Sequence, residues 1–121
     1  MSQAANIFDL TAADLMPNDL DKEQLDVLLQ SEQIKIERIV STGHSSLETG
    51  WYDQAQNEWV MVLAGEAILS FEETEDRHLS AGSYLNIPAH TRHRVKWTSP
   101  ATATIWLAIH YPTDARIKHQ H

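Results

Sequence analysis

The feature that most constrains this chain is a series of short apolar segments separated by turn signals, beginning at residue 34. The segments are IKIERIV (34–40), EWVMVL (58–63), AILSF (67–71), YLNIP (84–88), HRVKWT (93–98) and TATIWLAIHY (102–111). Glycine, proline and small polar residues stand between them, as at Ser41-Thr42-Gly43, Gly65, Gly82 and Pro112. Short β-type segments at intervals of roughly 8–12 residues are typical of a sandwich or barrel. The pattern predicts an all-β fold.

The length of 121 residues is enough for one domain. We expect an N-terminal arm and short helix over 1–33, a β-barrel over 34–112 and a polar C-terminal tail over 113–121. The helix is predicted at 19–30, because Asn18 can cap it and acidic residues fill its first turn. Its stripe of Leu25, Leu28 and Leu29 is expected to dock on the core.

Composition excludes several classes of protein. The chain has no cysteine, so disulfides, thiolate zinc sites and cysteine nucleophiles are ruled out. No apolar run reaches the roughly 18–20 residues of a membrane span, and MSQAANIFDL does not resemble a secretory signal. The formal net charge of −8 argues against nucleic acid as a partner. We expect a cytoplasmic protein that binds neither membranes nor nucleic acid.

Alternation places two ionisable side chains inside the barrel. In 58–63 Glu58 shares a face with Val60 and Val62, and in 93–98 His93 shares a face with Val95 and Trp97. A buried charge must be paired, hydrogen-bonded or bound to a cation. A divalent metal is one solution, because carboxylate and imidazole suit Mn, Fe, Ni or Zn. The alternative is a Glu–His hydrogen bond, or a bond from the glutamate to a hydroxyl or indole N–H.

Two motifs resemble the cupins, small double-stranded β-helix (jelly-roll) barrels. The spacing of Gly82, Pro88 and His93 matches the second cupin motif, and Glu58 and Gly65 match the second half of the first. The resemblance implies a cupin fold over roughly 34–111, with Glu58 and His93 as ligands. It also implies a first-motif His-x-His pair, which is absent here. His90 and Trp97 stand where the family usually has glycine and asparagine.

The residues that replace the missing pair depend on the register. If four residues separate the pair from Glu58, the pair becomes Trp51 and Asp53. If three residues separate them, the pair becomes Tyr52 and Gln54. We expect Asp53, Glu58 and His93 as the metal set, because a carboxylate is the better partner for a cation. Further pocket residues are expected to be Trp51, Tyr52, Gln54, His90 and Trp97.

Two functions of different classes are compatible with these residues. One is a metal-dependent cupin that acts on an unidentified small molecule, with catalytic residues unassigned. The other is a metal-free small-ligand-binding or structural and regulatory cupin without catalysis. A homodimer is expected in either case, because Trp59, Met61 and Leu63 make the second face of 58–63 apolar as well.

Overall fold

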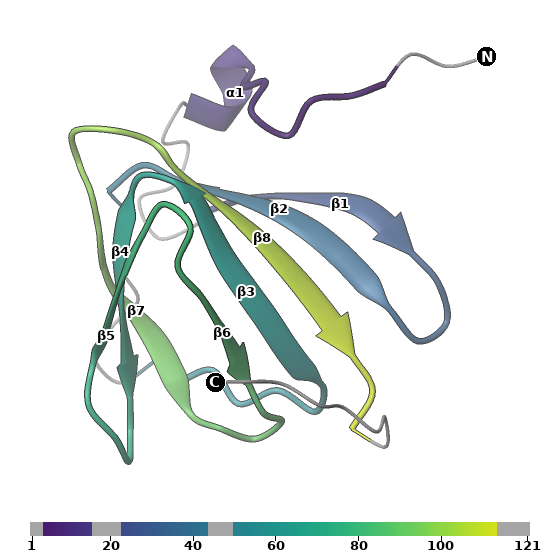
Figure 1. Cartoon of the computed structure of the whole chain (residues 1–121), viewed down its shortest axis with the longest axis vertical. Helices are drawn as coiled ribbons and strands as arrows, with labels where there is room; N and C mark the ends of the chain where they lie inside the picture. Colours follow the sequence, from purple (N-terminus) through teal and green to yellow (C-terminus); the bar gives the residue numbers. More distant parts are fainter. Residues whose placement is uncertain (1–3, 16–22, 44–49, 114–121) are drawn as a thin grey trace.

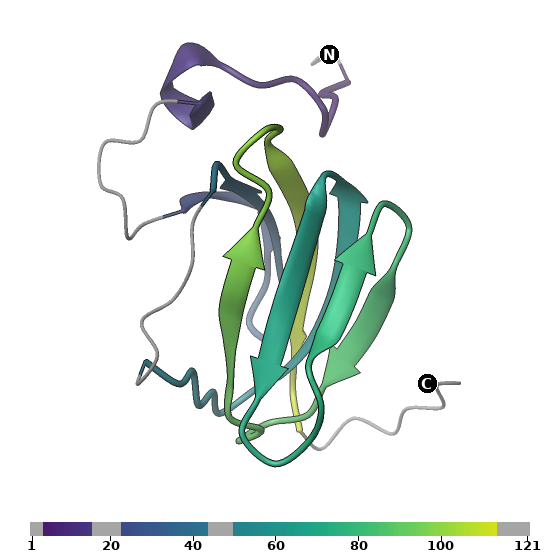
Figure 2. The ribbon, with the colours of Figure 1, turned by 90° about the vertical axis from the view of Figure 1, so that its left-hand side faces the viewer.

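Two antiparallel sheets face each other in the computed structural model, which describes residues 4–15, 23–43 and 50–113 (Figures 1 and 2). The five-stranded sheet has the order β1-β2-β8-β3-β6, and the three-stranded sheet has the order β5-β4-β7. The strands are β1 (Gln24–Gln30), β2 (Lys35–Ser41), β3 (Asn57–Ala64), β4 (Glu66–Phe71), β5 (Arg77–Ser80), β6 (Tyr84–Ile87), β7 (His93–Thr98) and β8 (Thr104–Tyr111). The predicted all-β architecture is therefore confirmed.

The core lies between the two sheets and follows the alternation of their strands. Along β3, Glu58, Val60 and Val62 are buried, while the residues between them are only partly buried. Val60 lies opposite Ala108 and Val62 opposite Trp106 on β8, so apolar side chains continue across the sheet. The three-stranded sheet closes the core with Ala67, Leu69, Leu79 and Val95.

The N-terminal arm is held on the outside of the larger sheet by Arg38. Its guanidinium donates to the carbonyl oxygens of Asp9 at 2.6 Å and Ile7 at 3.3 Å, and it pairs with Asp14 at 3.2 Å. Asp14 belongs to the short helix α1 (Ala12–Leu15). The pKa of its carboxyl is lowered, chiefly by a hydrogen bond from the Thr11 backbone N–H and also by Arg38. Arg38 thus anchors the segment that contains α1 to the larger sheet.

The helix predicted over 19–30 is wrong for the described part of that range. Residues 24–30 form β1, which pairs with β2 so that Leu25 lies opposite Ile39 and Val27 opposite Glu37. The leucine stripe also contains a period-2 pattern, and pairing with β2 overrode the helical signals. Leu25, Val27, Leu28 and Leu29 are exposed instead of docked on the core. Residues 19–22 lie outside the described part.

Two further boundaries differ from expectation. The five-stranded sheet begins at Gln24 and not at residue 34, and β5 adds a short strand at Arg77–Ser80, where the apolar pattern predicts none. The predicted tail lies outside the described residues beyond Thr113. The homodimer stays a prediction. In the described part of the chain, no helix has the length and apolar character needed to cross a membrane.

Candidate functional site

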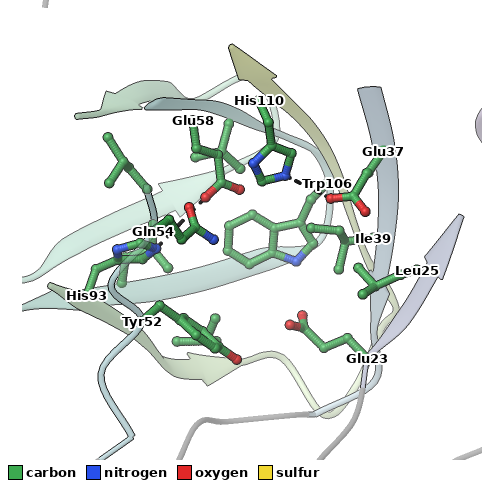
Figure 3. Close-up of a pocket in the computed structure, with 14 residues that line it drawn as sticks. Glu23, Leu25, Glu37, Ile39, Tyr52, Gln54, Glu58, His93, Trp106 and His110 are labelled. Atoms are coloured by element: carbon green, nitrogen blue, oxygen red, sulfur yellow. Dashed lines mark hydrogen bonds and ion pairs between the residues drawn. The ribbon is translucent and has the colours of Figure 1, made fainter. Parts of the chain in front are cut away.

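A cavity of about 200 Å³ lies between the two sheets (Figure 3). Its apolar wall includes Ile39, Val60, Leu69, Val95 and Trp106, from both sheets. Its polar lining is made of Glu23, Glu37, Tyr52, Gln54, Glu58, His93 and His110. Mostly apolar walls with a few convergent polar groups are typical of a small-molecule site.

Glu58 and His93 meet in this cavity, as alternation predicts. Glu58 comes from β3 and His93 from the start of β7, and His93 Nε2 lies 3.9 Å from Glu58 Oε1. Burial raises the pKa of the Glu58 carboxyl. The nearby His110 and His93 oppose that rise, and the Glu37 carboxylate adds to it. The Glu58 carboxyl therefore holds its proton more tightly than the carboxyl of an exposed glutamate does.

The orientation of the His93 ring is set by a backbone carbonyl. His93 Nδ1 lies 2.8 Å from the carbonyl oxygen of Thr91, which can only accept a hydrogen bond, so Nδ1 carries a proton. The neutral ring then presents the Nε2 lone pair to Glu58. Ring centroids of Tyr52 and Phe71 lie 5.7 and 6.0 Å from that of His93, so its ring is also held by packing.

A second carboxylate–imidazole pair lines the same cavity and was missed by sequence reasoning. His110 Nε2 lies 2.8 Å from Glu37 Oε1, and both side chains are buried. Lys35 Nζ lies 3.7 Å from the other oxygen of Glu37. The signal was available: Glu37 and Ile39 share a face of β2, as Trp106 and His110 do on β8. Alternation applied to these two strands would have found the pair.

Glu23 is held at the cavity by a hydrogen-bond chain. The Trp106 indole N–H donates to the Ser41 hydroxyl at 3.0 Å, and that hydroxyl donates to a carboxylate oxygen of Glu23. Ser41 is fully buried and Trp106 nearly so. These hydrogen bonds link Trp106, a wall residue of the cavity, to Glu23, the third carboxylate in its lining.

The structure selects Tyr52 and Gln54 over Trp51 and Asp53. An isolated bridge pairs Tyr52 with His93, and alternation from Tyr52 brings Gln54 to the same cavity. Asp53 points away and lies 2.7 Å from Nδ1 of the exposed His90. The Arg94 guanidinium lies over the Trp51 ring, with its Cζ atom 5.3 Å from the ring centroid. The structure therefore does not bring Asp53 to Glu58 and His93, and Trp51 is not in the cavity lining.

His90 and Trp97, the other expected pocket residues, also lie outside the lining. His90 takes a positive φ of 61° in its turn, with its side chain exposed beside Asp53. On β7, Val95 pairs with Leu69 but Trp97 pairs with Ile68, so an extra residue interrupts the alternation. This bulge turns Trp97 outward, 38 % exposed, and buries Thr98 in its place.

The side chains that line the cavity do not complete the expected set of metal ligands. Among the described residues, no group of three His, Cys, Asp or Glu side chains is arranged to hold a metal ion. Glu58 and His93 supply two ligands, while the Nε2 atom of His110 is engaged by Glu37. An amide and a phenol, from Gln54 and Tyr52, stand where the family has two imidazoles. The divalent metal stays a prediction.

Comparisons with known proteins agree on the fold. The profile of the Cupin domain family matches residues 39–110. A structure from Ralstonia eutropha JMP134, assigned provisionally as a mannose-6-phosphate isomerase, is 40% identical with a TM-score of 0.79, covering 92% of this chain and 99% of that one. No protein of curated function matches the sequence.

Two more distant structures show the fold alone. A cupin superfamily protein from Desulfitobacterium hafniense DCB-2 is 21% identical with a TM-score of 0.63, covering 85% of this chain and 89% of that one. An RmlC-like cupin family protein with a double-stranded β-helix fold, from Methanocaldococcus jannaschii, is 13% identical with a TM-score of 0.62, covering 93% and 94%. With the two facing sheets and the matched motifs, these findings show that the chain belongs to the cupin domain family.

Proposed function

We propose that this cupin binds a small organic molecule in the barrel cavity and uses Glu58 and His93 to transfer a proton to or from that molecule, without a resident metal. The observation that carries the proposal is the buried Glu58 carboxyl, 3.9 Å from the Nε2 atom of an imidazole whose other nitrogen is held by Thr91. A perturbed carboxyl facing a positioned imidazole in a cavity is characteristic of acid–base sites.

The separation of the two groups suits a ligand atom between them. At 3.9 Å, Glu58 and His93 are too far apart for a good direct hydrogen bond. An oxygen or nitrogen atom about 2.8 Å from each would complete a triangle with them. Because its pKa is raised by burial, Glu58 is a stronger base when ionised than an exposed glutamate. The proton removed from the ligand would be held by Glu58 or by His93 Nε2.

The Ralstonia structure supports proton transfer more than it supports a substrate. Its provisional isomerase assignment is compatible with acid–base chemistry at the carboxyl–imidazole pair. A sugar phosphate is a poor fit for this chain, because no lysine or arginine is among the described residues that line the cavity. We therefore leave the phosphate ester out of the proposal.

A fragment screen followed by NMR tests the binding function. The wild-type protein would be screened against small fragments, with shifts read at Tyr52, Gln54 and the Trp106 indole. We expect hits that shift these signals in the wild type and in the control Trp97→Ala, and that weaken in Glu58→Gln and His93→Gln. Hits with an exchangeable C–H next to a carbonyl would then be incubated in D₂O, where only the wild type and control should accelerate deuterium incorporation.

The outcomes separate the three parts of the proposal, which are ligand binding, proton transfer and the absence of a resident metal. A screen with no hit at the cavity contradicts the binding function, and bound hits that exchange no faster with protein contradict the proton transfer. Elemental analysis of untagged protein tests the third part. We expect substoichiometric Mn, Fe, Ni and Zn, and one metal per chain that disappears in His93→Ala would overturn a metal-free site.

A further inference from the structure

We propose that the molecule bound in this cavity is a small organic cation, a protonated amine on a compact apolar body. The inference rests on the proposed binding function and names the class of ligand that the cavity takes. It is carried by the hydrogen-bonding roles of Glu58 and His93, by the charges that line the cavity, and by its apolar walls.

Inside the cavity, Glu58 and His93 present two hydrogen-bond acceptors to each other. The proton on His93 Nδ1 is committed to the Thr91 carbonyl, so the neutral ring offers only a lone pair at Nε2. Glu58 is 7 % exposed, and the described part of the chain gives its carboxylate no hydrogen-bond donor within normal distance. Two acceptors 3.9 Å apart call for a group that donates to both.

An ammonium group meets that need better than a hydroxyl. It has three N–H donors and no acceptor, so one nitrogen can donate to Glu58 and to His93 together. A hydroxyl has one donor and satisfies only one of the two. Water has two donors, but the hydrogen bonds of a cation to a carboxylate are shorter and stronger. The ammonium also compensates the charge of the buried carboxylate.

The remaining charges in the lining favour the same ligand. Glu37 and Glu23 add two carboxylates, and the Nε2 atom of His110 is engaged by Glu37, 2.8 Å away. Even with both cavity histidines protonated and Glu58 neutral, the formal charges of the described lining only cancel. The cavity therefore repels phosphates and carboxylates more than it attracts them.

The apolar walls and the volume of the cavity determine the size and character of the ligand beyond its ammonium group. A dry apolar cavity of about 150 Å³ accommodates benzene. The present cavity of about 200 Å³ has Val60, Leu69 and Val95 in its wall together with Glu58 and His93. A ring with one aminomethyl group matches this size and combines an apolar body with one cationic group.

Three probes of nearly equal shape isolate the charge: benzylamine, benzyl alcohol and benzoate. Each would be titrated into isotopically labelled full-length protein near neutral pH, with shifts read at Tyr52, Gln54 and Trp106. We expect benzylamine to bind about tenfold or more tightly than benzyl alcohol, and benzoate to bind most weakly. In Glu58→Gln the preference for the amine should fall to about threefold or less. The control Glu72→Gln, an exposed glutamate paired with Arg92, should retain it.

Each result decides the inference. Equal affinity for amine and alcohol, tighter binding of benzoate, or an amine preference that survives in Glu58→Gln would overturn it. Alcohol binding without amine preference leaves the binding function standing. If none of the probes shifts cavity signals, the organic-cation inference is contradicted, while the fragment screen decides the binding function separately.

Discussion

Tyr52 and His93 exchange both of their backbone hydrogen bonds, with the Tyr52 N–H 2.7 Å from the His93 carbonyl and the His93 N–H 3.2 Å from the Tyr52 carbonyl. Residues directly opposite each other in an antiparallel pair share a face. The bridge therefore puts the Tyr52 ring beside the His93 ring and fixes which residues of the 51–54 segment reach the cavity. It is the reason that Tyr52 and Gln54, rather than Trp51 and Asp53, replace the missing histidine pair.

Glycine is required at position 65 for two reasons, which are the positive φ of the backbone and the close approach of neighbouring atoms. Its φ is +87°, and a Cβ atom there would lie 2.5 Å from Thr104 Oγ1 and 2.8 Å from the Ala103 carbonyl oxygen. We expect Gly65→Ala to lower the free energy of unfolding by roughly 3 kcal/mol or more, from left-handed strain plus overpacking. Urea unfolding measures the change.

Gly82 is the matched control for Gly65. Its φ is +93°, but nothing lies within 4 Å of a Cβ atom built there. Gly82→Ala should carry only the conformational strain, roughly 1 kcal/mol. Equal losses in the two variants would show that close contact with Thr104 adds nothing.

The two tryptophans Trp97 and Trp106 should differ sharply when truncated. Trp106 is 3 % exposed, lies in the cavity wall and donates to Ser41, whereas the β7 bulge leaves Trp97 38 % exposed. We expect Trp106→Ala to cost roughly 3–5 kcal/mol in unfolding free energy, and Trp97→Ala about 1 kcal/mol. Thermal and urea unfolding test this. A loss of unfolding free energy from Trp97→Ala as large as that from Trp106→Ala would contradict the outward position of the Trp97 ring.

Arg38 should stabilise the protein more than an ordinary surface arginine. Its side chain is 11% exposed and binds Asp14, Asp26 and two carbonyls of the arm. We expect Arg38→Ala to cost roughly 2–4 kcal/mol, because it leaves the buried Asp14 carboxylate without its cation and removes the donor to the arm carbonyls, and Arg38→Lys to recover only part. Arg92→Ala, which removes an exposed pair with Glu72, should stay within about 0.5 kcal/mol. Similar losses in Arg38→Ala and Arg92→Ala would contradict the anchoring role.

The raised pKa of Glu58 predicts a pH-dependent difference between wild type and Glu58→Gln. A carboxyl whose folded pKa lies above its unfolded value binds more protons when folded. Its stabilising contribution is complete below the unfolded pKa and is lost as pH rises through the folded pKa. The unfolding free energy of Glu58→Gln relative to wild type should therefore increase with pH from about 4.5 upward, and then level off. Urea unfolding across this range measures the difference, and a constant or falling difference would contradict the burial effect.

Local patterns predicted the barrel and the central pair because both depend on strand alternation. Glu58 and His93 each stand among apolar residues at a spacing of two, and Gly65, Gly82 and Pro88 mark turns. Trp97 was wrongly placed because a bulge depends on pairing with β4, which the local pattern does not contain. The helix over 19–30 failed for a related reason, since pairing of Leu25 with Ile39 overrode the helical signals.

The most direct test of the account is the protonation state of the His93 imidazole, read by long-range ¹H–¹⁵N NMR above neutral pH in the wild-type protein. We predict a protonated Nδ1 and an unprotonated Nε2 whose ¹⁵N signal moves when benzylamine is added. An Nε2–H tautomer with an unprotonated Nδ1 would contradict the account, because Nε2 would then be a donor and the cavity would no longer present two acceptors to a ligand.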